Sequence, residues 1–270
     1  MAFDPRPPCA LTIAGSDSGG GAGVQADLRT FAAHGVHGLC VLAALTAQNT
    51  QGVTAVHVPP ATFVRAQIDA CFADFNIVAV KIGMLANAEV VDAVADALSA
   101  HAPSHIVLDP VMVATSGAKL LDDDAHRSLR ERLLPMASVL TPNIPEAEWL
   151  IGHSVPDAEA AGAALRELHA LGPKAVLLKG AHLDEGGNVI DRWFDGEVEH
   201  AFVHARIDVE GHGTGCTLAS AIAANLCLGL APFDAAREAG VYVARALALS
   251  YRPGQAEMQV LDHFGAARRG

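Results

Sequence analysis

A glycine-rich segment late in the chain, GHGTGC (211–216), carries the strongest chemical signal in the sequence. Gly213, Thr214 and Gly215 would place backbone N–H groups at the first turn of a helix through TLASAIAANLCLG, and such a helix start binds phosphate. A plain N-cap by Thr214 is the alternative. Cys216 stands in that first turn, where the helix dipole would favour its thiolate. It could be a nucleophile, a proton-accepting base or an inert apolar side chain, and sequence order does not choose among these.

A second glycine-rich segment, GSDSGGGAG (15–23), follows one apolar run and precedes a run of helical period. It is not a Walker A loop, because Gly21 and Ala22 stand where Lys and Ser or Thr are required, and it does not fit the GxGxxG pattern. Five glycines in nine residues would let backbone approach a ligand closely. A flexible turn between a strand and a helix is the alternative.

Three charged residues stand where apolar runs end. Lys179 closes the run AVLLKG in a chain with only four lysines. Because an unpaired buried cation is costly, its side chain either reaches solvent or meets an anion, and we favour the anion. Asp109 and Glu146 carry hard oxygen ligands of the kind that Mg²⁺ binds. Either carboxylate could instead cap a helix, Glu146 especially because it follows Pro145 in a first helical turn.

The elements that must position these groups alternate between short apolar runs and longer runs of helical period. Strands are predicted over 10–15, 39–47, 77–83, 105–110, 138–143 and 175–180. Helices are predicted over 24–32, 59–72, 90–98, 122–134 and 157–171, and from 214 onward. A DG turn between β-rich runs predicts an antiparallel hairpin over 189–203. Together these features predict an α/β fold with a mostly parallel central sheet and helices on both faces.

In such a sheet the ligand site lies beyond the carboxyl ends of the strands. Few distinctive side chains stand at those positions: Asp17, Gln48, Met84, Asp109, Asn143 and Lys179. We therefore expect these six side chains to line one cleft. The sequence has no linker and no internal repeat, so residues 1–270 are predicted to form a single domain.

The composition narrows the function classes. Half of the residues (51%) are hydrophobic and the formal net charge is −12, with no basic run that could neutralise a nucleic acid. The five cysteines are scattered and never spaced as CxxC, which argues against disulfides and zinc. The thirteen histidines form no HExxH pattern, and His212 is notable because it adjoins the glycine loop. No signal-peptide pattern and no uncharged apolar run of 18 residues are present, which predicts a cytoplasmic protein without a membrane span.

Taken together, the motifs resemble a known family. The strings ALTIAGSDSGGGAGVQADL, TAQNTQGV, KIGML, VLDPVM, LTPNIPEAEWL, VLLKGAH and HGTGCTLASAIAANL occur in this order. They resemble the hydroxymethylpyrimidine and phosphomethylpyrimidine kinases of thiamine biosynthesis, within the ribokinase-like superfamily. The resemblance covers about 10–251 and leaves 252–270 as a C-terminal tail. In that tail RPGQAEMQVLDHF replaces the family's GHGP-like stretch before NHF and keeps only the closing Asp-His-Phe.

The resemblance implies an ATP-dependent kinase that phosphorylates 4-amino-5-hydroxymethyl-2-methylpyrimidine and then its monophosphate. Cys216 would stand where ribokinase-like enzymes usually carry an aspartate base, and residues 213–215 would hold charge on the transferred phosphoryl group. Gln48 would pair with the aminopyrimidine edge, and Met84 would pack on the ring. The resemblance also places Gly15, Ala22, Asp27 and Val111 in the substrate pocket, Lys179 on the ATP phosphates and, through water, Glu146 on Mg²⁺. From their places at strand ends, we further expect Asn143 to contact ATP and Asp109 to bind Mg²⁺. The resemblance implies a homodimer as well.

Other functions are compatible with the same residues. A pyridoxal or pyridoxine kinase shares the fold and the cysteine type of loop, although Gln48 and the compact Met84 pocket favour the pyrimidine. Cys216 could be the nucleophile of an acyl transferase or hydrolase, but no acid that would orient its base is evident. A non-catalytic pyrimidine sensor would have lost its phosphate-facing groups, yet Lys179, Glu146 and the glycine loop are present.

Overall fold

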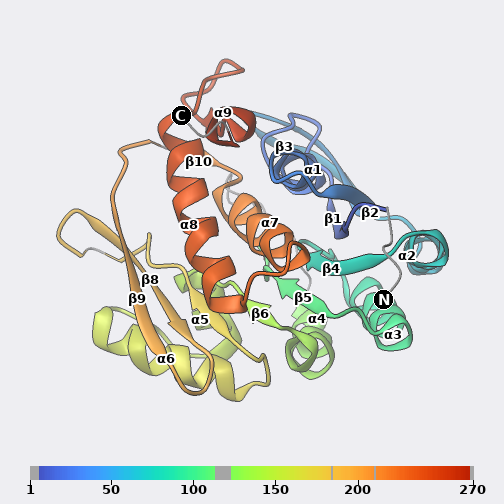
Figure 1. The fold of residues 1–270 in the computed structure, drawn as a ribbon, viewed down its shortest axis with the longest axis horizontal. Coiled ribbons are helices and arrows are strands. Elements are labelled where there is room, and N and C mark those ends of the chain that lie inside the picture. The colour runs from blue at the N-terminus through green and yellow to red at the C-terminus, as the bar shows by residue number, and fades with distance from the viewer. Residues whose placement is uncertain (1–5, 113–122, 184, 210, 268–270) are drawn as a thin grey trace.

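The structure, a computed structural model of the chain, describes residues 6–112, 123–183, 185–209 and 211–267 (Figure 1). One sheet holds nine strands in the order β3-β2-β1-β4-β5-β6-β7-β8-β9. Their bounds are β1 Cys9–Gly15, β2 His37–Asn49, β3 Gly52–His57, β4 Ile77–Ile82, β5 His105–Leu108, β6 Val139–Leu140, β7 Val176–Leu178, β8 Asn188–Phe194 and β9 Glu199–Ala205. The strands from β2 to β7 in this order pair in parallel, whereas β3, β8 and β9 pair antiparallel.

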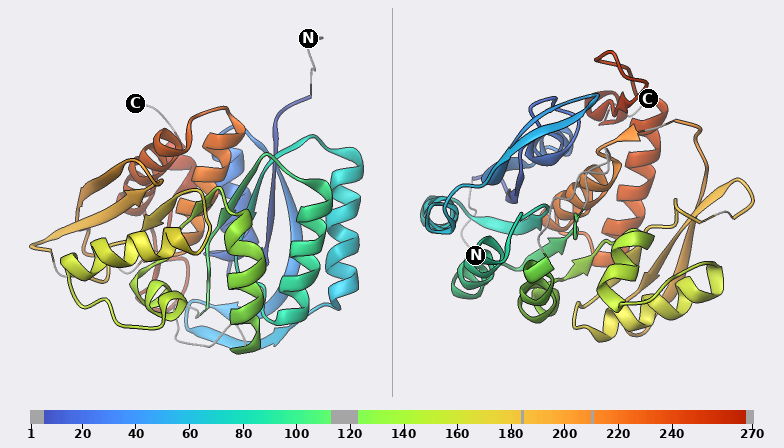
Figure 2. Two further views of the ribbon diagram at one scale, coloured as in Figure 1. Left: turned by 90° about the horizontal axis from the view of Figure 1, so that it is seen from below. Right: turned by 180° about the vertical axis from the view of Figure 1, so that it is seen from behind.

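Helices cover both faces of the sheet (Figures 1 and 2). One face carries α1 Gly23–Ala33, α7 Thr214–Cys227, α8 Pro232–Ala248 and α9 His263–Ala267. The other face carries α2 Ala61–Asp74, α3 Ala88–His101, α4 Asp123–Ser128, α5 Ile144–Ile151 and α6 Ala158–Ala170. Among the described residues, no helix combines the length and the apolar character needed to cross a lipid bilayer.

Side-chain size differs between the two faces of the sheet. Successive residues of a strand point to opposite faces, and in β1 Ala10 packs on the side of α7 whereas Leu11 and Ile13 pack on the side of α2 and α3. The central strand β4 repeats this contrast with Ala79 and Val80. Small side chains beneath α7 let this helix lie close to the sheet, and its residues 217–227 are all buried. The start of α7 is thereby fixed at the carboxyl edge of the strands.

The predicted parallel strands and the antiparallel hairpin are confirmed, with Gly196 at the hairpin turn in a left-handed conformation (φ +93°). The helix predicted over 122–134 begins partly outside the described residues. Within them, α4 ends at Ser128 and the chain continues as a π turn, Leu129–Leu133, and a 3-10 turn, Leu134–Met136. Pro135 lies in that last turn, where a regular α-helix could not continue.

Several elements were not predicted, among them the helices α8 and α9, one strand and a small second sheet. Strand β3 turns back along the end of β2, and its side chains are mostly exposed, so it lacks the apolar alternation of a half-buried strand. A second, two-stranded sheet joins β10 Gly211–His212 to β11 Gln259–Val260 in parallel. Strands of two residues are too short to show any sequence period. This small sheet ties the C-terminal tail to the loop before α7.

Candidate active site

The carboxyl edge of the parallel strands opens into a cleft of about 560 Å³, a size suited to a small ligand. All six strand-end residues expected there line it, namely Asp17, Gln48, Met84, Asp109, Asn143 and Lys179. Every other site residue predicted from the sequence also lines the cleft, except Asp27. The strand-end argument therefore predicted which side chains share this cleft, and one pocket residue implied by the resemblance, Asp27, does not line it.

The loop before α7 leaves the first N–H groups of the helix without a side-chain cap. Gly213 is the N-cap and adopts a left-handed conformation (φ +83°) that glycine reaches without strain. Thr214 is already the first helical residue, so the alternative of a Thr214 N-cap is wrong. A Cβ atom on Gly213 would collide with the backbone oxygen of Gly21, which shows that the two glycine-rich segments pack directly together. Such an uncapped helix start can hold an anion.

The same loop crosses the cleft from one chemical environment to another. At its beginning, His212 Nε2 lies 3.0 Å from Asp17 Oδ2. Three residues later, a Cβ atom on Gly215 would lie 3.2 Å from Lys179 Nζ, so only glycine fits without displacing the ammonium group. We name the first environment the amide end (Asp17, Thr46, Gln48 and His212) and the second the charged end (Lys81, Asp109, Glu146 and Lys179).

At the charged end, two carboxylates share one ammonium group. Lys179 Nζ donates to Asp109 Oδ1 at 2.9 Å and lies 3.6 Å from Glu146 Oε2. Both acids are buried, so the anion expected beside Lys179 is provided by the protein itself. The pKa of Glu146 is raised to about 7 overall. Burial is the main cause, Lys179 opposes it, and the nearby Asp109 adds to it. Near neutral pH Glu146 can therefore take up or release a proton.

Glu146 also fulfils the capping role that the sequence left open. The Asn143 side chain accepts from the backbone N–H of Glu146 at 2.9 Å, and the Glu146 carboxylate accepts from the backbone N–H of Asn143 at 2.8 Å. This capping box starts α5 at the cleft wall. Asn143 is thereby committed through its side chain to the helix start, and its contribution to the cleft comes from its position in the lining.

The acids of the charged end fit Mg²⁺ only together with a ligand that brings its own oxygens. Mg²⁺ in nucleotide enzymes is commonly bound by one or two carboxylates, waters and phosphate oxygens. Asp109 and Glu146 supply such a pair on one wall. Among the described residues, no group of three or more potential ligands forms a closed metal cage. The donor set suits a metal that arrives with phosphates.

Lys81 was not singled out in the sequence, although it ends an apolar run as Lys179 does. It lines the cleft, and its Nζ donates to both carboxylate oxygens of Asp27 at 2.9 and 3.0 Å. Asp27 also accepts from Thr12 Oγ1 at 2.6 Å and from Ser220 Oγ at 2.7 Å, and it is fully buried. The expectation that Asp27 contacts the substrate is thus not supported by its position. Its carboxylate is saturated beneath the cleft, where it holds Lys81.

Cys216 lies in the first turn of α7 and lines the cleft. Burial raises the pKa of its thiol to about 11; Lys81 lowers the pKa, whereas Asp27 and Asp109 raise it. The sequence argument expected the helix start to favour the thiolate. That expectation is wrong for the isolated protein, because desolvation and the two nearby carboxylates outweigh the helix dipole.

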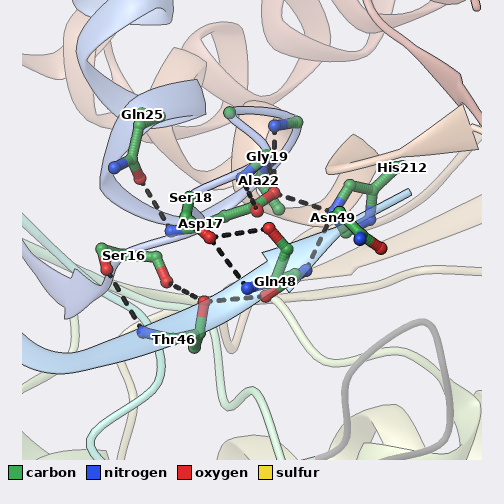
Figure 3. Close-up of polar contacts among 12 residues, drawn as sticks. Ser16, Asp17, Ser18, Gly19, Ala22, Gln25, Thr46, Gln48, Asn49 and His212 are labelled. Atoms are coloured by element: carbon green, nitrogen blue, oxygen red, sulfur yellow. Dashed lines mark hydrogen bonds and ion pairs between the residues drawn. The ribbon is translucent and has the colours of Figure 1, made fainter. Parts of the chain in front are cut away.

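At the amide end, Asp17 organises the first glycine-rich segment (Figure 3). Its carboxylate accepts from the backbone N–H groups of Gly19, Gly21 and Ala22 at 2.8 to 3.0 Å, and His212 Nε2 contacts it at 3.0 Å. Burial alone would raise the pKa of Asp17, but the hydrogen bonds from His212 and from the backbone lower it overall. Asp17 therefore stays ionised at neutral pH.

Gln48 lies beside this cluster near the end of β2 (Figure 3). Its backbone is fixed by Ser18, whose hydroxyl donates to Gln48 O at 2.6 Å and accepts from Gln48 N at 2.8 Å. Its side-chain amide lies between Thr46 Oγ1, at 3.1 Å, and His212 Nε2, at 3.3 Å. The amide is thus held at both of its polar ends.

Apolar groups complete the amide end. Met84 packs with Ala44, Ala86 and the partly buried Val111. A Cβ atom on Gly15 would lie 2.9 Å from Met84 Sδ, so the glycine leaves room for the methionine side chain. A soft thioether next to the Gln48 amide suits a flat heteroaromatic ring with polar edges.

A family model described as phosphomethylpyrimidine kinase matches residues 17–261, a range that contains the amide end, the charged end and α7. The chain belongs to the phosphomethylpyrimidine kinase family. It is accordingly a phosphotransferase, and its ribokinase-like fold is as predicted. Membership decides against the acyl-transferase and sensor alternatives.

Relatives of known name agree with this assignment. The chain is 49% identical over 260 residues to the hydroxymethylpyrimidine/phosphomethylpyrimidine kinase of Synechococcus elongatus, covering 95% of this chain and 97% of that protein. It is also 49% identical over 258 residues to a bifunctional thiamine biosynthesis protein of Geobacter sulfurreducens. There it covers 95% of this chain but 52% of the relative, so the chain spans about half of that bifunctional protein.

Solved structures of the family and of pyridoxal kinases share the fold. The phosphomethylpyrimidine kinase of Clostridium difficile 630 has a TM-score of 0.79 at 40% identity and covers 88% of this chain and 98% of its own. The pyridoxal kinase of Staphylococcus aureus in complex with AMP-PCP and pyridoxal has a TM-score of 0.87 at 29% identity, covering 96% of this chain and 94% of its own. The fold alone therefore does not separate the two substrate classes.

The tail, in which this kinase departs from the family pattern, packs behind the start of α7. Its retained His263 places Nε2 at 3.1 Å from Thr217 Oγ1, and Tyr242 donates to the backbone oxygen of His263 at 2.9 Å. Val260 is buried and pairs with His212 across the small sheet. The tail thus supports the glycine loop from outside the cleft.

Proposed function

We propose that this kinase transfers the terminal phosphoryl group of ATP to the hydroxymethyl group of 4-amino-5-hydroxymethyl-2-methylpyrimidine. We further propose that it phosphorylates the monophosphate to the diphosphate, as a step of thiamine biosynthesis. The observation that carries this proposal is the path of residues 211–216, which connects the amide end to the charged end within one cleft. A ring bound at the first end would have its alcohol directed at phosphates bound at the second.

The chemistry follows from the groups that line this path. The first N–H groups of α7 and the Lys179 ammonium would neutralise charge on the migrating phosphoryl group. Cys216 Sγ would accept the alcohol proton as the oxygen attacks phosphorus. A small thiolate fraction suffices, because the loose transition state of phosphoryl transfer requires positioning and charge neutralisation more than base assistance. Lys81 favours the thiolate that this role needs.

The remaining groups would bind the two substrates. Gln48 would pair with the edge of the aminopyrimidine, and Met84 would pack on its ring. Lys179 and Asn143 would face ATP, and Asp109 and Glu146 would hold Mg²⁺ directly or through water. When bound, the ion supplies positive charge to the phosphate oxygens. We also propose that the kinase is cytoplasmic and acts as a homodimer.

A coupled assay of ADP formation tests this function. With Mg²⁺, ATP and the pyrimidine alcohol we expect turnover, and with the monophosphate in place of the alcohol we expect a second activity. Omitting Mg²⁺ should abolish both. Tight binding of the alcohol with no ADP formation would contradict the proposal, and turnover of the alcohol without turnover of the monophosphate would confine it to the first step.

Pyridoxal phosphorylation is the second candidate, because structures of pyridoxal kinases superimpose on 96% of this chain with TM-scores of 0.87 to 0.88. Both substrates are hydroxymethylated heteroaromatic rings. Initial rates with the two alcohols at equal concentration separate the candidates. We expect faster turnover of the pyrimidine, and faster turnover of pyridoxal would reverse the order.

A further inference from the structure

We propose that His212 is a positioning residue that orients the Gln48 side-chain amide and thereby selects the order of donor and acceptor on the substrate ring. This inference rests on the proposed function and deepens it. The amide can adopt two orientations, related by a half-turn about its last side-chain bond, which exchange its oxygen and its NH₂ group. The contacts at its two ends determine which orientation is compatible with the surrounding hydrogen atoms.

The contact with His212 requires the amide oxygen. Asp17 is ionised, and an ionised carboxylate can only accept hydrogen bonds. His212 Nε2, which lies 3.0 Å from Asp17 Oδ2, must therefore carry a hydrogen atom. A protonated ring nitrogen cannot accept from the NH₂ group of Gln48, 3.3 Å away, whereas the amide oxygen can share the single Nε2 hydrogen with Asp17.

The contact with Thr46 independently requires the amide NH₂ group. Thr46 Oγ1 lies 2.8 Å from the backbone oxygen of Ser16, an atom that can only accept, so the single hydroxyl hydrogen is committed there. The hydroxyl oxygen is then an acceptor toward the Gln48 amide, 3.1 Å away. The two ends of the amide thus demand the same orientation, with oxygen toward His212 and NH₂ toward Thr46, which is the half-turn alternative to the orientation drawn in Figure 3.

This orientation leaves one acceptor site and one donor on Gln48 for a ligand. The amide oxygen keeps its second lone pair beside His212, and the NH₂ group keeps its second hydrogen beside Thr46. A ring with an exocyclic amino group next to an unprotonated ring nitrogen satisfies both. The amino group would lie toward His212 and the ring nitrogen toward Thr46. A 4-oxo ring, which presents C=O and N–H in the reverse order, would face oxygen with oxygen and hydrogen with hydrogen.

The test compares two probes that differ only in this order: 4-amino-5-hydroxymethyl-2-methylpyrimidine and its 4-oxo counterpart. The dissociation constant of each is measured by calorimetry without ATP, and kcat/KM is measured with ATP. We expect the wild type to favour the amino probe by about 10²-fold, because the wrong order leaves buried polar groups unpaired. His212→Leu and Thr46→Val each release one end of the amide and should reduce this ratio about tenfold.

Two matched variants separate orientation from general support. His212→Gln keeps an N–H donor toward Asp17 and Gln48, and it should retain most of the wild-type ratio. Ser18→Ala loosens the Gln48 backbone without touching its amide, so it should weaken both probes equally and leave the ratio unchanged. Thr46→Val alone tests the inference if His212→Leu does not fold.

Equal ratios in the wild type and in both releasing variants would overturn the inference, as would His212→Gln losing the ratio as fully as His212→Leu. A wild type that binds the two probes equally would overturn it too. The proposed function fails separately: a wild type that prefers the amino probe in binding but forms no ADP contradicts the kinase assignment of this alcohol while the binding ratio supports the orientation.

Discussion

The two ends of the cleft use polar groups in different ways. At the charged end, Lys179 lies between two buried carboxylates, and Lys81 is paired with a third. At the amide end a single carboxylate, Asp17, is held by backbone N–H groups and one histidine. Charge acts over distance with little dependence on angle, whereas hydrogen bonds depend on direction and on which atom donates. The charged end is therefore suited to neutralising phosphate, and the amide end to distinguishing rings.

Lys179→Met should have the largest effect on catalysis and none on ring selection. The substitution removes the cation that phosphate and the acids share, so we expect kcat to fall by about 10³- to 10⁴-fold. It also leaves Asp109 and Glu146 facing each other, which raises the pKa of Glu146 further. Steady-state kinetics with both probes measure the effect.

Lys174→Met is the matched control, because this substitution removes the same charge from an exposed position outside the cleft. If Lys179→Met changed the preference between the amino and oxo probes and preserved kcat, the separate roles assigned to the two ends of the cleft would be contradicted.

Asp27→Ala should act on stability more than on substrate binding. It would leave the fully buried Lys81 ammonium without its partner, which typically costs about 3 to 5 kcal/mol of unfolding free energy. The double variant Asp27→Asn, Lys81→Gln removes both charges and should recover much of that loss. Urea unfolding measures the two. An unchanged unfolding free energy with a raised KM for the alcohol would instead favour the direct substrate contact implied by the resemblance.

The positions of the cleft residues could be predicted from sequence because parallel strands end at one edge. Asp17, Gln48 and Lys179 are far apart in the chain, but each follows or ends an apolar run, and that pattern can be recognised in the amino-acid sequence. The pairing of Asp27 with Lys81 was not visible, because it joins a helix to a strand 54 residues away. An aspartate on the buried face of a helix resembles a pocket residue until its partner is known.

The protonation state of Cys216 could not be predicted from the sequence either. The helix start could be predicted, but the cost of desolvation depends on how closely α7 lies against the sheet, and Ala10 and Ala79 determine that only after folding. Likewise, β10 and β11 become a sheet only because the tail returns to His212, a contact that no local pattern encodes.

Cys216→Ala should lower kcat by about 10²- to 10³-fold, as expected for loss of a general base. Because burial raises the pKa of the thiol to about 11, the thiolate fraction of the wild type grows as pH rises toward that value. We therefore expect kcat to increase from about pH 7 to 9, by up to about tenfold per unit where proton acceptance limits the rate. Cys216→Asp should retain substantial activity with a flat profile over this range, because a carboxylate is already ionised.

The same pKa shift has a consequence for stability. The folded state binds the thiol proton more tightly than the unfolded state does, so the contribution of Cys216 to stability is present below the unfolded pKa and lost as pH rises through about 11.

An alanine variant with the same kcat as the wild type would contradict the assignment of Cys216 as the proton acceptor. The charged end would then act through charge alone.

Gln48→Ala should have the smallest effect and the most selective one. Loss of the buried amide pairing should weaken binding of the alcohol by about 1 to 3 kcal/mol, which raises its KM roughly five- to 150-fold. The KM for ATP should stay the same, because Gln48 belongs to the amide end. Asn49→Ala is the matched control, since this exposed neighbour carries the same amide and its oxygen accepts from the backbone N–H of Gln51. If Gln48→Ala lowered kcat as strongly as it raised the KM of the alcohol, ring recognition would also set the approach of the alcohol to the phosphate, and the two ends would act as one unit.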